Sequence, residues 1–208
     1  MVSYPLTLPT HLVKSLVIRK ANVAGMSVSP YTGSQEVISF PGEWWEADVG
    51  FAPAAMLAAG AIEAFIGKLK GPVGTFLMGD PMRPVPFGQA ASFPGTPVVD
   101  GAHVKGDTVL DIKSGPLSKA GWLLAGDYVQ LGTSTNTRLH QVMDDANTDG
   151  AGKTSVNIWP ALRYDLSDND TVVITACKGI FRIPQAKLAI TRRPGPKTDF
   201  SFTAIEAL

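Results

Sequence analysis

The residues best spaced for chemistry form an acidic loop, Asp145-Ala146-Asn147-Thr148-Asp149-Gly150. Alternating oxygen ligands followed by a glycine are typical of the first half of a calcium loop. The twelfth position of such a loop normally provides a bidentate glutamate, but here it is Val156. Because this ligand is missing and the flanking runs have the pattern of strands, we interpret the segment as an Asp-Gly hairpin turn, with calcium binding as the alternative.

A glycine-rich run, Gly150-Ala151-Gly152-Lys153-Thr154, overlaps this turn and is similar to a phosphate-binding P-loop. A P-loop would place its first glycine at Asn147 and would continue into a helix, whereas residues 155–159 have the pattern of a strand. Without a helix N-terminus to hold the phosphates, nucleotide binding is not expected.

Acid–base catalysis has few candidates. The histidines, His11, His103 and His140, are far apart, and neither a Gly-x-Ser-x-Gly nor a His-Glu-x-x-His motif accompanies them. His140 follows Leu139 in a predicted strand, which favours a surface or hydrogen-bonded residue over a general base. The neighbouring carboxylates that could serve a glycosidase are Glu43 with Glu46 and Asp144 with Asp145. Adjacent acids are common in turns, so we predict no catalytic, cofactor-binding or metal-binding residues and no enzymatic activity.

Two further residue types could mark a binding site. Trp44 and Trp45 should point to opposite faces of a strand, one into the core and the other towards a partner or, as the alternative, a sugar. Cys177 is the only cysteine, so a disulfide within the chain or a cysteine-rich zinc site cannot form. It lies in the apolar run 172–177, which predicts a buried thiol rather than a reactive one.

Strand patterns and one helix pattern position these residues in the N-terminal part. Strands are predicted at 12–19, 35–40, 45–51 and 75–78, with turn formers in 22–30 and a break at Pro41-Gly42. Residues 53–70 carry a helical apolar stripe that begins at a proline and stops at Gly71. The stripe is formed by Met56, Leu57, Ile62, Phe65, Ile66 and Leu69.

The rest of the chain has only strand patterns. A proline-rich connector at 81–97 precedes predicted strands at 98–99, 108–112, 128–131, 138–143, 155–159 and 171–176. Further strands are predicted at 181–183, 187–191 and 200–205, with a turn at 193–196. If the last hairpin pairs with the N-terminal strands, residues 1–92 and 178–208 form one discontinuous β domain with one helix, and residues 93–177 form an inserted small β-barrel.

Several of these segments resemble tail proteins of long-tailed bacteriophages. In the N-terminal part they are Ser29-Pro30-Tyr31-Thr32-Gly33, Gly42-Glu43-Trp44-Trp45-Glu46-Ala47-Asp48-Val49 and Gly74-Thr75-Phe76-Leu77-Met78-Gly79-Asp80-Pro81. In the middle and at the end they are Ala125-Gly126-Asp127-Tyr128-Val129-Gln130-Leu131-Gly132, Arg138-Leu139-His140-Gln141-Val142, Asp149-Gly150-Ala151-Gly152, Ile158-Trp159-Pro160-Ala161-Leu162-Arg163 and Phe202-Thr203-Ala204-Ile205-Glu206-Ala207-Leu208. These residues are mostly glycines, prolines and core aromatics rather than catalytic groups.

The resemblance is to distal tail proteins, and it implies a structural virion protein that forms a ring where the tail tube ends. It implies a mainly β fold, with a tail-tube-like sandwich or split barrel, one helix and an inserted barrel. The expected partners are copies of the chain, commonly six in a ring, the tail tube protein and the hub proteins of the tail tip or baseplate. The expected location is the virion tail tip, after assembly in the host cytoplasm. Many members are longer and carry a lectin-like C-terminal domain, whereas this chain ends at Leu208.

Composition agrees with assembly and disfavours other partners. Charged residues make up only 17% of the 208 residues, which is few for a monomer that must keep its whole surface wet. Basic and acidic residues number 18 each, so no net positive field attracts nucleic acid or an anionic membrane. The first nine residues lack the positive charge of a secretory signal, and residues 51–69 are too interrupted to span a bilayer. The alternative functions are a carbohydrate-binding or a cell-wall-degrading protein of the tail.

Overall fold

The protein is mainly β with one α-helix among the residues that the structure describes, which confirms the predicted fold class. The computed structural model describes residues 2–10, 13–51, 54–187, 191–192 and 197–208. The first sheet has six strands in the order β1 (Leu6–Thr7), β5 (Thr75–Met78), β12 (Gly179–Arg182), β15 (Ser201–Glu206), β3 (Gln35–Phe51) and β2 (Val13–Val28). The second has the order β11 (Val172–Val173), β8 (Tyr128–Leu131), β9 (Arg138–Val142), β10 (Thr154–Trp159), β7 (Val109–Lys113) and β6 (Val98–Val99).

The first sheet joins strands from both ends of the chain. Strand β15 lies between β3 and β12, with Ala204 opposite Ala47 and Phe181 opposite Glu206. This confirms the predicted pairing of the last strand with the N-terminal strands. No strand of the first sheet lies between residues 79 and 178. The predicted division into domains at 92/93 and 177/178 is compatible with this pairing and remains a prediction.

The helix covers the core of the first sheet. It runs from Met56 to Leu69 as α1, three residues later than the predicted start at 53, which lies outside the described residues. Ile62, Phe65 and Leu69 are buried, and the Phe65 ring meets the Phe76 ring of β5 at 5.6 Å, edge to face. The helix ends before Lys70, which adopts the left-handed conformation common at the residue after a helix C-terminus.

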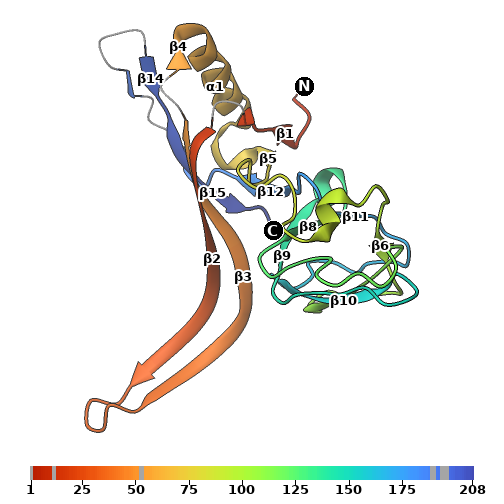
Figure 1. Ribbon diagram of the computed structural model, residues 1–208. Helices are drawn as coiled ribbons and strands as arrows, with labels where there is room; N and C mark the ends of the chain where they lie inside the picture. The colour runs from red at the N-terminus through yellow and green to blue at the C-terminus, as the bar shows by residue number, and fades with distance from the viewer. Residues whose placement is uncertain (1, 11–12, 52–53, 188–190, 193–196) are drawn as a thin grey trace.

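The long hairpin β2–β3 (Figure 1) differs from the prediction in two places. Strand β2 continues through the predicted turn region to Val28, and β3 is one strand rather than two. Pro41 and Gly42 form a bulge, because Asn22 pairs with Glu43 while Val23 pairs with Phe40. Proline is tolerated at a bulge, where no ladder hydrogen bond is required of it. Glycine is required beside it, since a Cβ on Gly42 would lie 2.6 Å from Val23 Cγ2.

The second sheet curls into a barrel. Its edge strands meet where Val98 bridges Thr171 and where the N–H of Val172 donates to the carbonyl of Pro97 at 3.0 Å. Val129, Leu131, Ile112 and Val156 are buried inside, around the Trp122 ring. Five of the six predicted barrel strands are found within one residue of their expected bounds, and β11 is shorter than the predicted 171–176.

Smaller elements complete the fold. Strands β4 (Ala54–Ala55), β13 (Thr191–Arg192) and β14 (Lys197–Asp199) form a three-stranded sheet next to α1, and short 3-10 helices lie at η2 (Gly71–Val73), η3 (Gln89–Ser92) and η4 (Ser134–Asn136). The predicted connector 81–97 contains η3 and no strand. Most of the predicted strand 187–191 and the turn 193–196 lie outside the described residues. No helix in the described part of the chain is long and apolar enough to cross a membrane.

Candidate assembly surface

The side-chain oxygens of the acidic loop do not point to one shared site, because each accepts hydrogen bonds from different backbone N–H groups. Oδ1 of Asp145 accepts the N–H of Ala125 at 2.9 Å, and Oδ1 of Asn147 accepts the N–H of Gly121 at 2.7 Å. Oδ1 of Asp149 accepts the N–H groups of its own turn, from Ala151 and Lys153, both at 2.8 Å. These bonds hold the pKa of Asp149 below its ordinary value. Within the described ranges, no group of three His, Cys, Asp or Glu side chains could hold a metal ion. The loop therefore acts as the hairpin turn that its sequence predicts.

The described histidines are held by structural bonds. Nδ1 of His140 donates to the carbonyl of Pro160 at 2.7 Å, and the side chain is buried. Burial lowers its pKa to about 4, and the charges of Arg163 and Arg138 act in the same direction. Nε2 of His103 accepts the N–H of Asp111 at 3.3 Å. His11 lies outside the described residues. The sequence predicted either a surface residue or a hydrogen-bonded residue at His140, and the structure shows the hydrogen-bonded one.

The paired carboxylates do not face one another across a cleft. Glu46 accepts the indole N–H of Trp44 at 3.0 Å, while Glu43 accepts the N–H of Ala161 at 3.0 Å. Asp144 accepts the side-chain amide of Asn157 at 2.7 Å, so each of these acids is used within the fold. The two tryptophans separate as predicted, with Trp45 buried in the core and Trp44 partly exposed.

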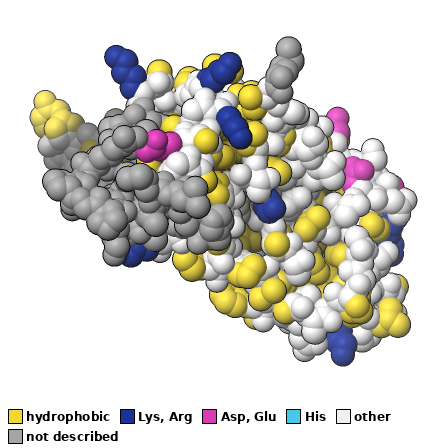
Figure 2. Space-filling model, turned by 90° about the horizontal axis from the view of Figure 1, so that it is seen from above, with side chains coloured by type: hydrophobic (Ala, Val, Ile, Leu, Met, Phe, Trp, Pro, Cys, Tyr) yellow, Lys and Arg dark blue, Asp and Glu magenta, His cyan; other side chains and the backbone are white. Residues whose placement is uncertain are grey.

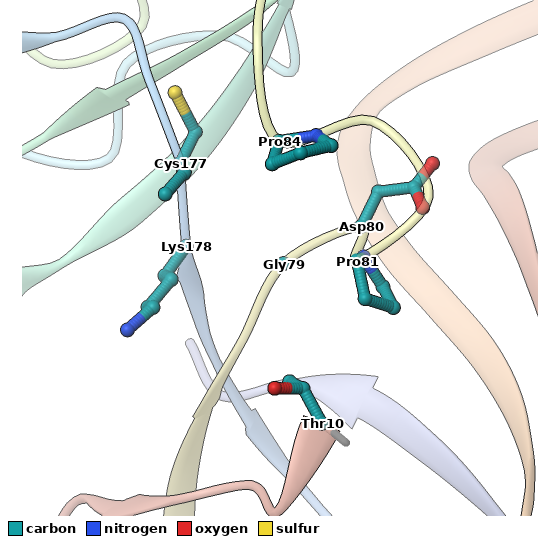
Figure 3. Close-up of a pocket in the computed structure, with 8 residues that line it drawn as sticks. Thr10, Gly79, Asp80, Pro81, Pro84, Cys177 and Lys178 are labelled. Carbon is teal, nitrogen blue, oxygen red and sulfur yellow. The ribbon is translucent and has the colours of Figure 1, made fainter. Parts of the chain in front are cut away.

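A pocket of about 310 Å³ lies beside Cys177 (Figure 3). Gly79, Pro81 and Pro84 form much of its wall. The carboxylate of Asp80 and the sulfur of Cys177 point away from each other, and burial raises the pKa of the Cys177 thiol to about 12. A thiol that stays protonated is a poor nucleophile, so the pocket has the buried cysteine that the sequence predicts and no reacting pair.

The most unusual surface is an arm formed by residues 23–40, the part of the β2–β3 hairpin beyond the bulge. Figure 1 shows it extending away from the other strands of the first sheet and from the barrel. All but one of its residues are exposed, and Glu36 is its only charged side chain. Seven large apolar side chains of the arm are exposed: Val23, Met26, Val28, Tyr31, Val37, Ile38 and Phe40. Such a concentration of exposed apolar surface marks an interaction site in a folded protein.

The arm has a hydrogen-bonded turn at its tip, and the outer edge of its strand β2 is unpaired in the described chain. The turn closes with bonds from the N–H of Ser29 to the carbonyl of Ser34 and from the N–H of Gly33 to the carbonyl of Ser29, both 2.9 Å. In the described chain, the 16-residue strand β2 pairs with β3 alone and forms the edge of its sheet. Edge strands are usually short, charged or covered, because their free N–H and C=O groups pair readily with another strand. Here the last eight residues of the edge carry no charge at all.

The barrel supports the base of the arm from one side. The indole N–H of Trp159 donates to Oδ1 of Asn22 at 3.2 Å, and Nζ of Lys20 lies 5.0 Å above the Trp159 ring. The rings of Trp159 and Trp45 meet edge to face at 4.6 Å, and the indole N–H of Trp45 donates to the carbonyl of Leu139 at 2.8 Å. Both strands of the hairpin are therefore held by the barrel where the arm begins.

A buried ion pair completes this support. Arg163, in the segment after β10, bonds both carboxylate oxygens of Glu206 at 3.0 and 3.3 Å and the carbonyl of Glu43 at 2.5 Å. Glu206, in β15, is 2% exposed and also accepts the N–H of Trp45 at 3.1 Å. One guanidinium thus ties the barrel to β15 and β3, two neighbouring strands of the first sheet, near the base of the arm.

No protein-family model matches the chain, and no curated protein matches it in sequence.

Sequence reasoning missed the arm, because glycine, serine and proline in 22–30 have the composition of a turn. The signal that could have identified it is the absence of charge: between Ala21 and Gly42, Glu36 is the only ionisable acid or base apart from the phenol of Tyr31. The contribution of Arg163 and Glu206 was also missed. They lie 43 residues apart, and only the fold brings them together.

Proposed function

We propose that this protein is a structural component of a bacteriophage tail that assembles with copies of itself into a ring at the distal end of the tail tube. The observation that carries the proposal is the arm together with the open edge of β2. An exposed apolar surface and a strand with one unpaired edge on the same hairpin favour pairing with another protein chain. The motifs that resemble distal tail proteins supply the identity of the assembly, with six copies per ring as the expected number.

The chemistry of the described residues supports a mechanical role over an enzymatic one. The described acids and histidines that could have catalysed a reaction are each bonded to groups of the fold. Glu43 lines a pocket of about 580 Å³, but its carboxylate is held by the N–H of Ala161. Low charge supports self-association as well. On the face shown in Figure 2, charged side chains are few and stand apart, with hydrophobic side chains between them. Identical chains with zero net charge do not repel one another at long range.

Size-exclusion chromatography with light scattering on the purified chain tests the proposal. We expect a mass that rises with concentration to a closed oligomer, near six times 22.0 kDa. A chain that remains a monomer at every concentration, including in the presence of a tail tube protein, would refute the proposal. The alternative functions would then be tested by clearing of a cell-wall suspension and by binding to a glycan array.

A further inference from the structure

The arm presents apolar side chains on both of its faces. In an antiparallel pair, residues directly opposite each other point to the same side, and successive residues alternate. Val23 lies opposite Phe40 and Gly25 opposite Ile38, so Val23, Ile38 and Phe40 share one face. Met26 lies opposite Val37 and Val28 opposite Gln35, so the second face carries Met26, Val28 and Val37. Each face has three large side chains that are more than a third exposed.

From these two faces we infer that the arm is inserted between two further copies of this chain, one covering each face. The inference rests on the proposed function. A strand pair that lies on a single partner, or that lines an open channel, needs an apolar surface on one side only, with polar residues on the other. Here two successive residues of β3 in the arm, Val37 and Ile38, are 61% and 53% exposed although they point in opposite directions.

The area of the arm is limited. Its seven exposed apolar side chains present on the order of 800 Å² in all, which is one partner's share of a single standard protein–protein interface, so each of two neighbours would cover about half of that area. A ring with cyclic symmetry gives every subunit one neighbour on each side, and an arm with two apolar faces can engage both. The barrel holds the base of the arm in place, so less conformational freedom has to be lost when the arm is covered.

Between the bulge and the core of the first sheet, the two faces of β2 lie in different surroundings. Along β2 the second face is continuous with Ile18 and Lys20, which lie over the core and the barrel, and the first face is continuous with Val17 and Arg19 on the outer side of the sheet. The neighbour on the second face therefore approaches from the barrel side. The neighbour on the first face approaches from the outer side.

Two adjacent residues provide a matched test, Val37→Lys for the second face and Ile38→Lys for the first. Each variant of the full chain is analysed by sedimentation or light scattering over a concentration series, next to the wild type. We expect both substitutions to weaken association by about tenfold or more, because each buries an unpaired charge in an interface. The control is Leu117→Lys, at an apolar residue of similar exposure on a barrel loop, which should associate like the wild type.

The possible outcomes separate the two proposals. If the wild type is a monomer, the ring itself fails. If the wild type associates but only one of the two substitutions weakens it, or neither does, the ring stands and the two-sided insertion is wrong. A second measurement does not depend on a charged substitution: Val37→Cys and Ile38→Cys, each labelled with a polarity-sensitive dye, should both report an apolar environment on association. The buried Cys177 is not expected to take the label. A shift from one position alone would also overturn the inference.

Discussion

Removing one partner of the ion pair between Arg163 and Glu206 should strongly destabilise the fold, because the other partner is left buried. The substitution Arg163→Met keeps much of the side-chain volume but removes three hydrogen bonds, two to Glu206 and one to the carbonyl of Glu43. The Glu206 carboxylate then remains 2% exposed with the N–H of Trp45 as its described donor. Breaking one side of a buried pair costs about 3 to 5 kcal/mol. We expect about 3 kcal/mol, because the Arg163 side chain is 16% exposed and water can reach part of the site.

Urea unfolding followed by tryptophan fluorescence measures this loss, since Trp45 and Trp159 lie at the junction that the ion pair supports. The matched control is Arg19→Met, which breaks an ion pair with Asp48 on the exposed side of the same hairpin and should leave the free energy of unfolding unchanged. The double variant Arg163→Met with Glu206→Gln should recover part of the loss, because a neutral amide can still accept the Trp45 N–H. The reasoning is refuted if Arg163→Met is as stable as the Arg19→Met control.

Three further predictions concern the buried residues. Trp45→Phe should lower the free energy of unfolding by roughly 2 kcal/mol, because the indole bond to the Leu139 carbonyl and part of the ring contact with Trp159 are lost; a urea titration that shows no change would contradict this. Because the pKa of His140 falls from its usual 6.5 to about 4 on folding, the unfolded chain binds more protons between these values. Stability should then fall as the pH drops from 6.5 to 4, by up to roughly 3 kcal/mol for this group, and His140→Gln should flatten that slope in unfolding titrations. The Cys177 thiol, whose pKa burial raises to about 12, should resist a thiol reagent in the native protein at pH 8 and react in denaturant, and rapid native labelling would show that it is accessible.

Much of the fold follows from local sequence pattern. The helix was predictable because Ile62, Phe65 and Leu69 recur at helical spacing, and the barrel strands because short apolar runs alternate with Gly and Asp turns. The long hairpin was not, because the bulge at Pro41-Gly42 has the same local composition as a turn. Whether such a pair ends a strand or only bends it depends on the partner strand, which a local pattern does not contain.

The candidate site was less predictable than the fold. Sequence reasoning could judge the acidic loop and the histidines, since metal and catalytic sites need particular spacings. It could not find the assembly surface, whose defining property is the absence of burial at Met26, Val37 and Ile38. A valine that faces solvent and a valine in a core have the same sequence pattern, and only the position of the other strands distinguishes them.

Electron microscopy of the purified, concentrated protein tests the central claim most directly. The account predicts closed rings with a central opening, in which each arm is covered on both faces by density from neighbouring subunits. Single particles the size of one 22.0 kDa chain, or assemblies in which the arms project freely into solvent, would contradict it.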